Sequence, residues 1–257
     1  MVNLREHNSD AWDREAIDGS PCSKPVGAAD IAAARAGNWG LRVTGSEPVP
    51  SVWLPDVRGL RVLCLGGGGG QQAPILAAAG GKVTVVDLSP AQLALDRFLA
   101  ERHALSINTI QTDMSDLNVL TDRSFDVVVH PVSNQYVPDC AVVWREASRV
   151  LEPQGILIAG FINPVDFALD RRLYSRGILQ IRHALPYSDF EILTEHEQSE
   201  MISAKIPFEF GHTFQAQIGG QTDAGFAITG FFEDRRTGDI LSKYMPSYFA
   251  TRAIKMR

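Results

Sequence analysis

A run of five consecutive glycines, residues 66–70, constrains the fold of this chain more than any other feature. The apolar residues Val62, Leu63 and Leu65 before the run predict a short buried strand, and residues 71–79 after it resume the spacing of a helix. Because glycine has no side chain, a turn built from it lets backbone N–H groups and a helix N-terminus face a ligand closely. The sequence therefore predicts the nucleotide side of a cofactor site; the alternative is an ordinary tight strand–helix turn.

The spacing of the glycines distinguishes between two classes of cofactor site. A dinucleotide-binding fold requires G-x-G-x-x-G, in which the third glycine allows the helix and the strand to pack closely. Counted from either of the first two glycines of the run, the third position of that motif holds a glutamine. The run fits G-x-G-x-G instead, at Gly66, Gly68 and Gly70.

With this spacing, the chain resembles the class I S-adenosylmethionine-dependent methyltransferases, whose first motif is an acidic residue followed by x-G-x-G-x-G. Cys64 stands where that family has the acid. The passage R-V-L-E-P-Q-G-I-L, residues 149–157, also resembles the family's R-V-L-K-P-G-G-x-L, with Gln154 in place of a glycine. The resemblance covers residues 60–162. It implies an α/β fold with a doubly wound, mostly parallel, seven-stranded Rossmann-like sheet, S-adenosylmethionine as cofactor and S-adenosylhomocysteine as product.

Polar residues follow several predicted strands directly. Residues 62–65, 82–86, 107–111, 125–129 and 156–162 predict strands, and the continuous apolar character of 125–129 is typical of a parallel sheet covered on both faces. In a doubly wound sheet, ligands gather at the carboxyl ends of the strands. The glycine run, Asp87, Asp113 and His130 all fall at such ends, which is the strongest evidence in the sequence for a cofactor site.

Two carboxylates at these strand ends have predicted roles in nucleoside binding. Asp87 lies about 20 residues beyond the glycine turn, where an acid accepts hydrogen bonds from both ribose hydroxyls. The alternative is a turn or capping carboxylate before the helix that Ser89 and Pro90 predict. The resemblance implies that Asp113 accepts from the adenine amino group and that Met114 packs on the ring. The alternative there is a polar turn with Met114 in the core.

The loop after the fourth strand, residues 130–136, is where the resembled family has residues beside the transferable methyl group. His130 is a candidate base, because an imidazole takes up a proton near neutral pH; the alternative is that it bonds to a backbone carbonyl and shapes the turn. His212 is a second candidate base, with a hydrogen-bonded structural histidine as the alternative. No metal ligands are predicted. The predicted cofactor-binding residues are Gly66, Gly67, Gly68, Gly70, Gln71, Asp87, Leu88, Asp113, Met114, His130, Pro131, Asn134 and Tyr136.

The remaining segments are expected to surround this core. In the resembled family, N-terminal segments often fold over the cofactor, and long insertions after the fifth strand often cover the substrate. Trp12 and Trp39 alternatively pack on the domain edge, and Asp30 predicts the N-cap of a short helix. The expected parts are an N-terminal lid (1–58), an S-adenosylmethionine-binding α/β core (59–162), a substrate cap (163–210) and the C-terminal part of the core sheet (211–257).

The C-terminal part of the sequence predicts one helix and two strands. The helix runs through Ile218 and is expected to break or tilt at Gly219 and Gly220. Residues 225–234 and 247–254 predict the sixth and seventh strands. The resemblance implies that the last strand is inserted antiparallel beside the fifth.

Composition narrows the choice of partners. The chain has 257 residues with a net charge of −6, which argues against a nucleic-acid partner because such partners require a basic surface. The three cysteines form no C-x-x-C pair, so neither a disulfide framework nor a zinc site is indicated. No apolar run is long enough to span a bilayer, and we expect a cytoplasmic protein without a membrane partner. Nothing in the sequence indicates an oligomeric state.

The predicted activity is in-line transfer of a sulfonium methyl group to an oxygen, nitrogen, sulfur or carbon nucleophile on a small-molecule acceptor. Such a reaction needs alignment and exclusion of water, and it needs a base only when the nucleophile must lose a proton. One alternative is a module that binds the cofactor without transferring methyl groups, or that catalyses another reaction at the same sulfonium. The other alternative is a nicotinamide-dependent oxidoreductase, which the missing third glycine and the lack of a Tyr-x-x-x-Lys pair after the fourth strand disfavour.

Overall fold

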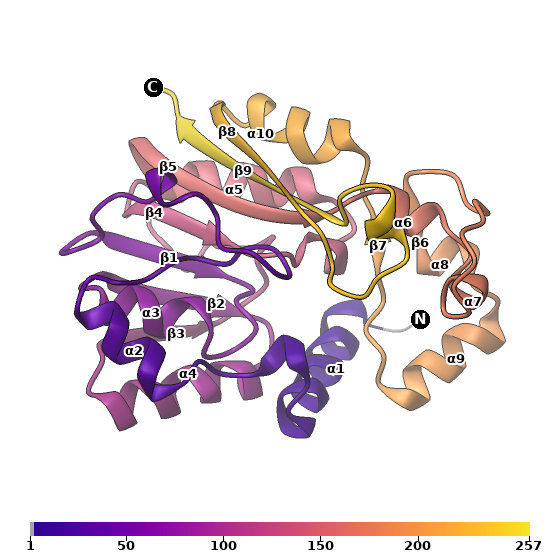
Figure 1. The fold of residues 1–257 in the computed structure, drawn as a ribbon, viewed down its shortest axis with the longest axis horizontal. Helices are drawn as coiled ribbons and strands as arrows, with labels where there is room; N and C mark the ends of the chain where they lie inside the picture. Colours follow the sequence, from indigo (N-terminus) through magenta and orange to yellow (C-terminus); the bar gives the residue numbers. More distant parts are fainter. Residues whose placement is uncertain (1–2) are drawn as a thin grey trace.

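Seven strands form one mixed sheet in the computed structural model, which describes residues 3–257 (Figure 1). The first five in sequence pair in parallel, β9 lies antiparallel to β5, and β8 lies antiparallel to β9. This arrangement confirms the predicted doubly wound, mostly parallel seven-stranded sheet and its antiparallel last strand. The spatial order is β3 (Ile107–Gln111), β2 (Lys82–Asp87), β1 (Arg61–Leu65), β4 (Phe125–His130), β5 (Leu151–Ile162), β9 (Tyr248–Lys255) and β8 (Phe226–Asp234).

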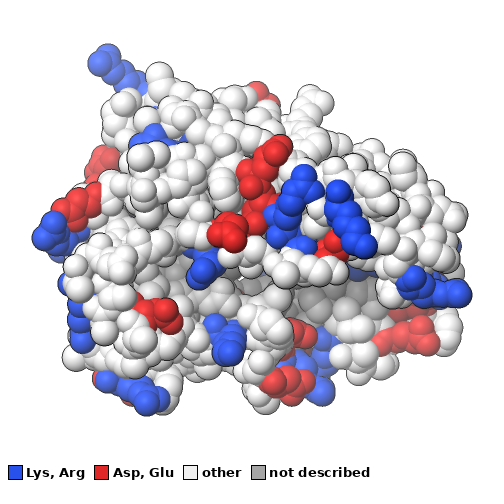
Figure 2. All heavy atoms as spheres, viewed as in Figure 1, with Lys and Arg blue, Asp and Glu red and all other residues white. Residues whose placement is uncertain are grey.

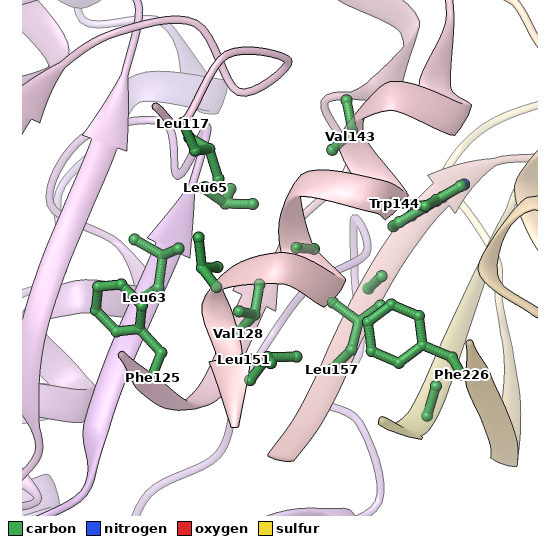
Figure 3. Close-up of a cluster of buried hydrophobic side chains, with 14 of the residues drawn as sticks. Leu63, Leu65, Leu117, Phe125, Val128, Val143, Trp144, Leu151, Leu157 and Phe226 are labelled. Carbon is green, nitrogen blue, oxygen red and sulfur yellow. The ribbon is translucent and has the colours of Figure 1, made fainter. Parts of the chain in front are cut away.

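Alternate residues of the central strands face two separate apolar layers, because side chains along a strand point to opposite faces. On one face, Leu63 and Leu65 of β1 and Val128 of β4 pack against α5 (Cys140–Val150), whose Trp144 is wholly buried (Figure 3). On the other face, Val62 and Cys64 are covered by α3 (Gln72–Ala78) and α4 (Pro90–His103). The two layers fix the carboxyl ends of the strands at one edge.

The described part of the N-terminal segment, from residue 3, contains the helices α1 (Leu4–Asp18) and α2 (Ala28–Arg35). No pattern in the sequence predicts α1, because the buried face of this helix consists of His7, Asn8 and Ala11 and lacks an apolar stripe. The short helix expected near Asp30 is present, but its N-cap is Gly27. Asp30 lies at the third helical position, where its carboxylate accepts a hydrogen bond of 2.9 Å from the Gly27 amide. The predicted N-cap was therefore wrong: the helix begins three residues earlier than Asp30 would place it.

Short elements after β5 form a separate group beside the sheet (Figure 1). They are α6 (Val165–Ala168), α7 (Arg171–Tyr174), β6 (Tyr187–Ser188), α8 (Asp189–Ile192), α9 (Glu195–Ala204) and β7 (Phe210–Gly211). The strands β6 and β7 pair antiparallel in a sheet of their own. Within residues 3–257, no helix is both long and apolar enough to cross a membrane.

A π-helical turn, Gln215–Gly219, leads directly into α10 (Gly220–Asp223). The predicted break at the two glycines does not occur: the helix changes there from a π turn to an α turn. Packing explains why Gly220 is a glycine: a Cβ at this position would lie 2.8 Å from the Trp144 ring. The glycine thus allows the helix to approach α5. Within residues 3–257 there are also four 3₁₀ turns, at Pro21–Ser23, Ser51–Trp53, Asn134–Tyr136 and Leu241–Lys243.

Candidate functional site

A cavity of about 450 Å³ lies where β1 to β5 end. It is walled by the sheet edge, by the N-terminal segment and by residues that follow β5. The structure brings ten predicted site residues together on its wall: Gly66, Gly67, Gly68, Gln71, Asp87, Leu88, Asp113, Met114, Pro131 and Tyr136. Four predicted residues are not part of the wall: Gly70, His130, Asn134 and His212.

The glycine loop needs glycine for reasons of conformation and of space. Gly66 and Gly68 have φ values of 57° and 66°, a region that other residues rarely adopt. A Cβ on Gly68 would lie 2.6 Å from the backbone oxygen of Cys22, so the N-terminal segment can approach the loop only if this position has no side chain. Gln71 stabilises this contact between the N-terminal segment and the loop, because its Nε2 donates to the same Cys22 oxygen at 2.8 Å.

A buried carboxylate that the sequence analysis missed anchors the far end of the loop. Asp96 of α4 is 2% exposed and accepts a hydrogen bond of 2.9 Å from the Gly70 amide. Burial raises the pKa of its carboxyl to about 7, and the Gly70 amide opposes that rise. Gly70 therefore contributes to the loop's attachment. The sequence does contain a sign of this buried carboxylate. Asp96 is three residues from Leu93 and from Leu99, which places it on the apolar face of the predicted helix.

Asp87 ends β2 with its carboxylate at the cavity wall. One oxygen accepts from the Ser89 amide at 2.9 Å, and Ser89 caps α4 as predicted, accepting from the Gln92 amide. Burial raises the pKa of the Asp87 carboxyl to about 6, while the amides of Ser89, Leu88 and Gly68 lower it. The carboxylate is therefore mostly ionised at neutral pH.

Two glutamine oxygens at the same end of the cavity have unused hydrogen-bonding capacity. Gln72 Oε1 and Gln92 Oε1 are buried and have no partner among residues 3–257, although both side chains line the cavity. Gln72 Oε1 also lies beside the loop, 3.4 Å from where a Gly67 Cβ would be. Unpaired buried acceptors are costly in a folded protein unless a ligand or a water molecule supplies the donor. The glycine cradle, Asp87 and these oxygens fit a ligand with several N–H and O–H groups.

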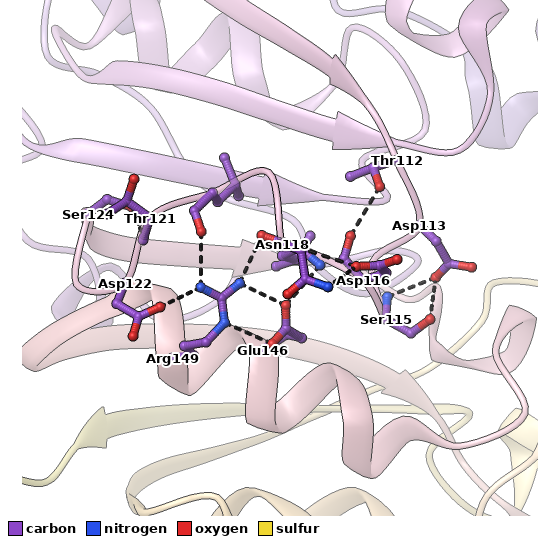
Figure 4. A network of polar contacts seen from close by, with 12 residues as sticks. Thr112, Asp113, Ser115, Asp116, Asn118, Thr121, Asp122, Ser124, Glu146 and Arg149 are labelled. Carbon is purple, nitrogen blue, oxygen red and sulfur yellow. Dashed lines mark hydrogen bonds and ion pairs between the residues drawn. The ribbon is translucent and has the colours of Figure 1, made fainter.

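Asp113 lines the cavity, but both of its carboxylate oxygens have protein partners. Oδ1 accepts from the amide and the hydroxyl of Ser115 at 2.8 and 2.6 Å, and Figure 4 shows both contacts. Oδ2 forms an ion pair with Arg5 of α1 at 2.8 Å. Its predicted contact with an adenine amino group stays a prediction. Met114 follows it on the cavity wall.

The two candidate bases lie behind the cavity wall. His130 is 0% exposed, with Nε2 at 2.7 Å from Asn134 Oδ1 and Nδ1 at 3.3 Å from the Leu65 oxygen. His212 Nε2 lies 3.0 Å from the Asn134 backbone oxygen. Burial lowers the pKa of both imidazoles. These contacts match the structural alternatives, in which both histidines are hydrogen-bonded within the protein. Neither histidine lines the cavity, and a catalytic role for either stays a prediction.

The other end of the cavity is lined by residues that the sequence analysis did not select: Glu209, Arg236 and Tyr248. Arg236 Nε donates to the Tyr248 hydroxyl at 2.8 Å. Glu209 Oε2 forms an ion pair with Arg171 at 2.6 Å. Charged side chains of both signs are intermixed on the face of the molecule seen in Figure 2.

Helix α1 joins the two ends of the cavity. Its Ser9 hydroxyl donates to the Leu88 oxygen after β2 at 3.0 Å. The preceding residue, Asn8, accepts a hydrogen bond of 2.9 Å at its Oδ1 from the Phe208 amide. Trp12, which lines the cavity, packs edge-on against Tyr136 with ring centroids 5.0 Å apart. Asn8 and Trp12 of this helix thus form part of the cavity wall between the sheet and the residues after β5.

Comparisons with known proteins agree with this geometry. A family model described as a methyltransferase domain matches residues 63–159. The uncharacterized methyltransferase YbaJ of Bacillus subtilis (strain 168) is 48% identical over 256 residues, covering 100% of both chains. The ubiquinone biosynthesis O-methyltransferase of Xanthomonas oryzae pv. oryzae (strain PXO99A) is 32% identical over 116 residues, which are 44% of this chain and 48% of that protein.

A solved structure shares the fold. The crystal structure of an S-adenosylmethionine-dependent methyltransferase from Mesorhizobium loti superposes with a TM-score of 0.60 at 21% identity. The superposition covers 79% of this chain and 94% of that one.

Proposed function

The chain belongs to the class I S-adenosylmethionine-dependent methyltransferases, and we propose that it methylates a small-molecule acceptor bound in the cavity at the strand ends. Bound S-adenosylmethionine supplies an electrophilic methyl group on its sulfonium. One observation carries the proposal: a single cavity of about 450 Å³ extends from the glycine loop and Asp87 to Glu209 and Arg236. This volume lies in the range of small-ligand sites, which is roughly 300–1,000 Å³.

In this proposal, the glycine loop and Asp87 hold the cofactor. The carboxylate of Asp87, ionised at neutral pH, accepts hydrogen bonds from the ribose hydroxyls. Leu88, Met114 and Pro131 supply apolar contacts on the wall. Cys64 stands where the family has an acidic residue. It is buried in the sheet core, and burial raises the pKa of its thiol, so it supplies no negative charge for the amino-acid end of the cofactor.

Gln72 is proposed to take over from the acid that this chain lacks at position 64. Its Oε1 is buried, unpaired within residues 3–257, and adjacent to Gly67. A neutral amide oxygen accepts a hydrogen bond from an ammonium or hydroxyl group as a carboxylate does, with a smaller contribution to affinity. The proposal thereby explains how the site functions with a cysteine at that position.

The N-terminal segment is proposed to act as a lid, and residues 163–210 as the acceptor cap. Support for the lid comes from Asn8, Trp12 and Cys22, which line the cavity and bond or pack against both of its ends. Support for the cap comes from Glu209, held in place by Arg171. Covering the cavity excludes water and aligns the acceptor, which are the main requirements of an in-line displacement.

Isothermal titration calorimetry tests the proposed function. We expect S-adenosylmethionine and S-adenosylhomocysteine to bind, and NADH not to bind. Binding of NADH without binding of either sulfur nucleoside would refute the proposal. Release of S-adenosylhomocysteine with small acceptors then separates a methyltransferase from a module that only binds the cofactor.

A further inference from the structure

We propose that Glu209 receives the proton of the methyl acceptor, and that the acceptor is therefore a small molecule whose nucleophile is an O–H or N–H group. The inference rests on the proposed function, because it assigns a role at the acceptor end of the same cavity. It addresses a step for which the structure leaves both histidines behind the cavity wall.

Glu209 is directed into the cavity by the alternation of a short extended segment. Its neighbours Phe208 and Phe210 are buried and pack on the ring of Phe190, with centroids 4.4 and 6.1 Å away. Because successive side chains of an extended chain point in opposite directions, Glu209 points away from this aromatic cluster. Its side chain is 21% exposed and lines the cavity.

The carboxylate is fixed at one oxygen and through its backbone. Oε2 pairs with Arg171 at 2.6 Å, and the Arg171 guanidinium lies over the rings of Phe167 and Tyr187, 5.9 and 5.7 Å from their centroids. The Glu209 amide donates to the buried Asp189 carboxylate at 2.7 Å. The other oxygen, Oε1, has no hydrogen bond within residues 3–257. One free oxygen on a rigid carboxylate is the geometry that a proton acceptor requires.

The charges around Glu209 suit this role. Burial raises the pKa of its carboxyl, as do Asp189 and Asp166, whereas Arg171 lowers it. The net direction brings the carboxyl closer to neutral pH, where a base is most effective. The nearby Tyr136 hydroxyl has a pKa raised by burial and by Glu209, so it stays protonated.

The chemical step balances without a further reactant. A lone pair on the acceptor's oxygen or nitrogen forms the bond to the methyl carbon, and the carbon–sulfur bond breaks with its electron pair on sulfur. The O–H or N–H proton passes to Glu209 Oε1 and from there to water. An acceptor without such a proton, for example a dialkyl sulfide, transfers no proton to Glu209.

The first test measures binding and needs no known acceptor. Sinefungin carries an amino group where S-adenosylmethionine carries its methyl group, so its ammonium lies next to the acceptor position, whereas S-adenosylhomocysteine has no charge there. Calorimetry compares both ligands on the wild type, on Glu209→Gln and on a matched control, Glu146→Gln. Glu146 also pairs with an arginine, Arg149, at 2.8 Å, but outside the cavity (Figure 4).

We expect the wild type and Glu146→Gln to bind sinefungin about tenfold more tightly than S-adenosylhomocysteine. Glu209→Gln is expected to lose this preference and to bind S-adenosylhomocysteine as the wild type does. The same preference in all three proteins would overturn the role of Glu209. A wild type that binds neither ligand would refute the proposed function itself, which makes the two failures distinguishable.

The second test measures turnover as release of S-adenosylhomocysteine with phenol, a primary amine and dimethyl sulfide as probes. Methylation is expected only with the first two. Glu209→Gln should lower kcat by roughly 100-fold or more with little change in KM, and should remove the acidic limb of the pH profile. Turnover of dimethyl sulfide, or an unchanged pH profile in Glu209→Gln, would contradict the proposal. If no probe is turned over, the ligand preference decides alone.

Discussion

Replacing Asp87 by asparagine should affect stability and cofactor binding in opposite directions. Burial raises the pKa of the Asp87 carboxyl from 3.8 to about 6. One pKa unit corresponds to about 1.4 kcal/mol, so the ionised carboxylate destabilises the ligand-free fold by at most about 3 kcal/mol. Asparagine keeps an oxygen that accepts from the Ser89 amide and removes the charge.

The pH dependence follows from the direction of that pKa change. Because the folded-state pKa lies above the unfolded one, the penalty is absent below about pH 4 and complete above about pH 6. Urea unfolding of the ligand-free proteins should therefore show Asp87→Asn gaining stability over the wild type as the pH rises through this range. At about pH 8 the gain should be 1–3 kcal/mol.

Cofactor binding should change in the other direction. The ribose hydroxyls lose hydrogen bonds to a charged acceptor, so calorimetry with S-adenosylhomocysteine should show a loss of about 1–3 kcal/mol for Asp87→Ala and a smaller loss for Asp87→Asn. Asp139 offers a matched control, because it accepts from Ala141 two residues on at 2.9 Å but is exposed and outside the cavity. Asp139→Asn should change neither quantity. Unchanged affinity in both Asp87 variants, or a less stable Asp87→Asn at about pH 8, would refute the reasoning.

Two further variants test the roles of other residues. Gln72→Leu should weaken binding of S-adenosylhomocysteine in calorimetry by about 0.5–1.5 kcal/mol, because one neutral hydrogen bond is lost; an affinity equal to that of the wild type would exclude Gln72 from the site. His130→Gln should lower the melting temperature, because the buried contacts with Asn134 and Leu65 are disturbed, and it should leave the pH profile of turnover unchanged. A stable variant whose profile loses a limb would instead establish His130 as a base.

The parallel core could be predicted because its determinants are local. The apolar runs, the glycine turn and the Ser89 cap each specify their element through nearby residues, and the structure contains all of them. The order of the strands followed from the family resemblance, since periodicity alone does not place the last strand. Asp87 and the first three glycines reach the cavity because the carboxyl ends of parallel strands share one edge.

The position of His130 shows where that argument fails. The residue does end β4, as predicted, but it has the same parity as Val128 and therefore points toward α5, where its ring packs edge-on against Trp144. The position at the end of the strand correctly placed His130 at the edge of the sheet. The alternation of side chains along β4 determined which face of the sheet it points to. A count of parity along β4 would have directed attention away from this histidine.

The end of the cavity at Glu209, where we propose that the acceptor binds, could not be predicted because its contacts are distant in sequence. Asn8 of α1 bonds to Phe208, and no local pattern links these two residues. Glu209 lies in a segment with too few residues for a recognisable strand period. Its ion pair with Arg171 joins residues 38 positions apart, and no sequence pattern pairs them.

The most direct test of the account is a crystal structure of the protein with S-adenosylhomocysteine. The account predicts that the adenosine lies in the cavity, with both ribose hydroxyls in hydrogen-bond contact with the Asp87 carboxylate and the amino-acid tail beside the glycine loop. A ligand bound elsewhere, or ribose hydroxyls that face other groups while Asp87 makes no contact, would contradict it.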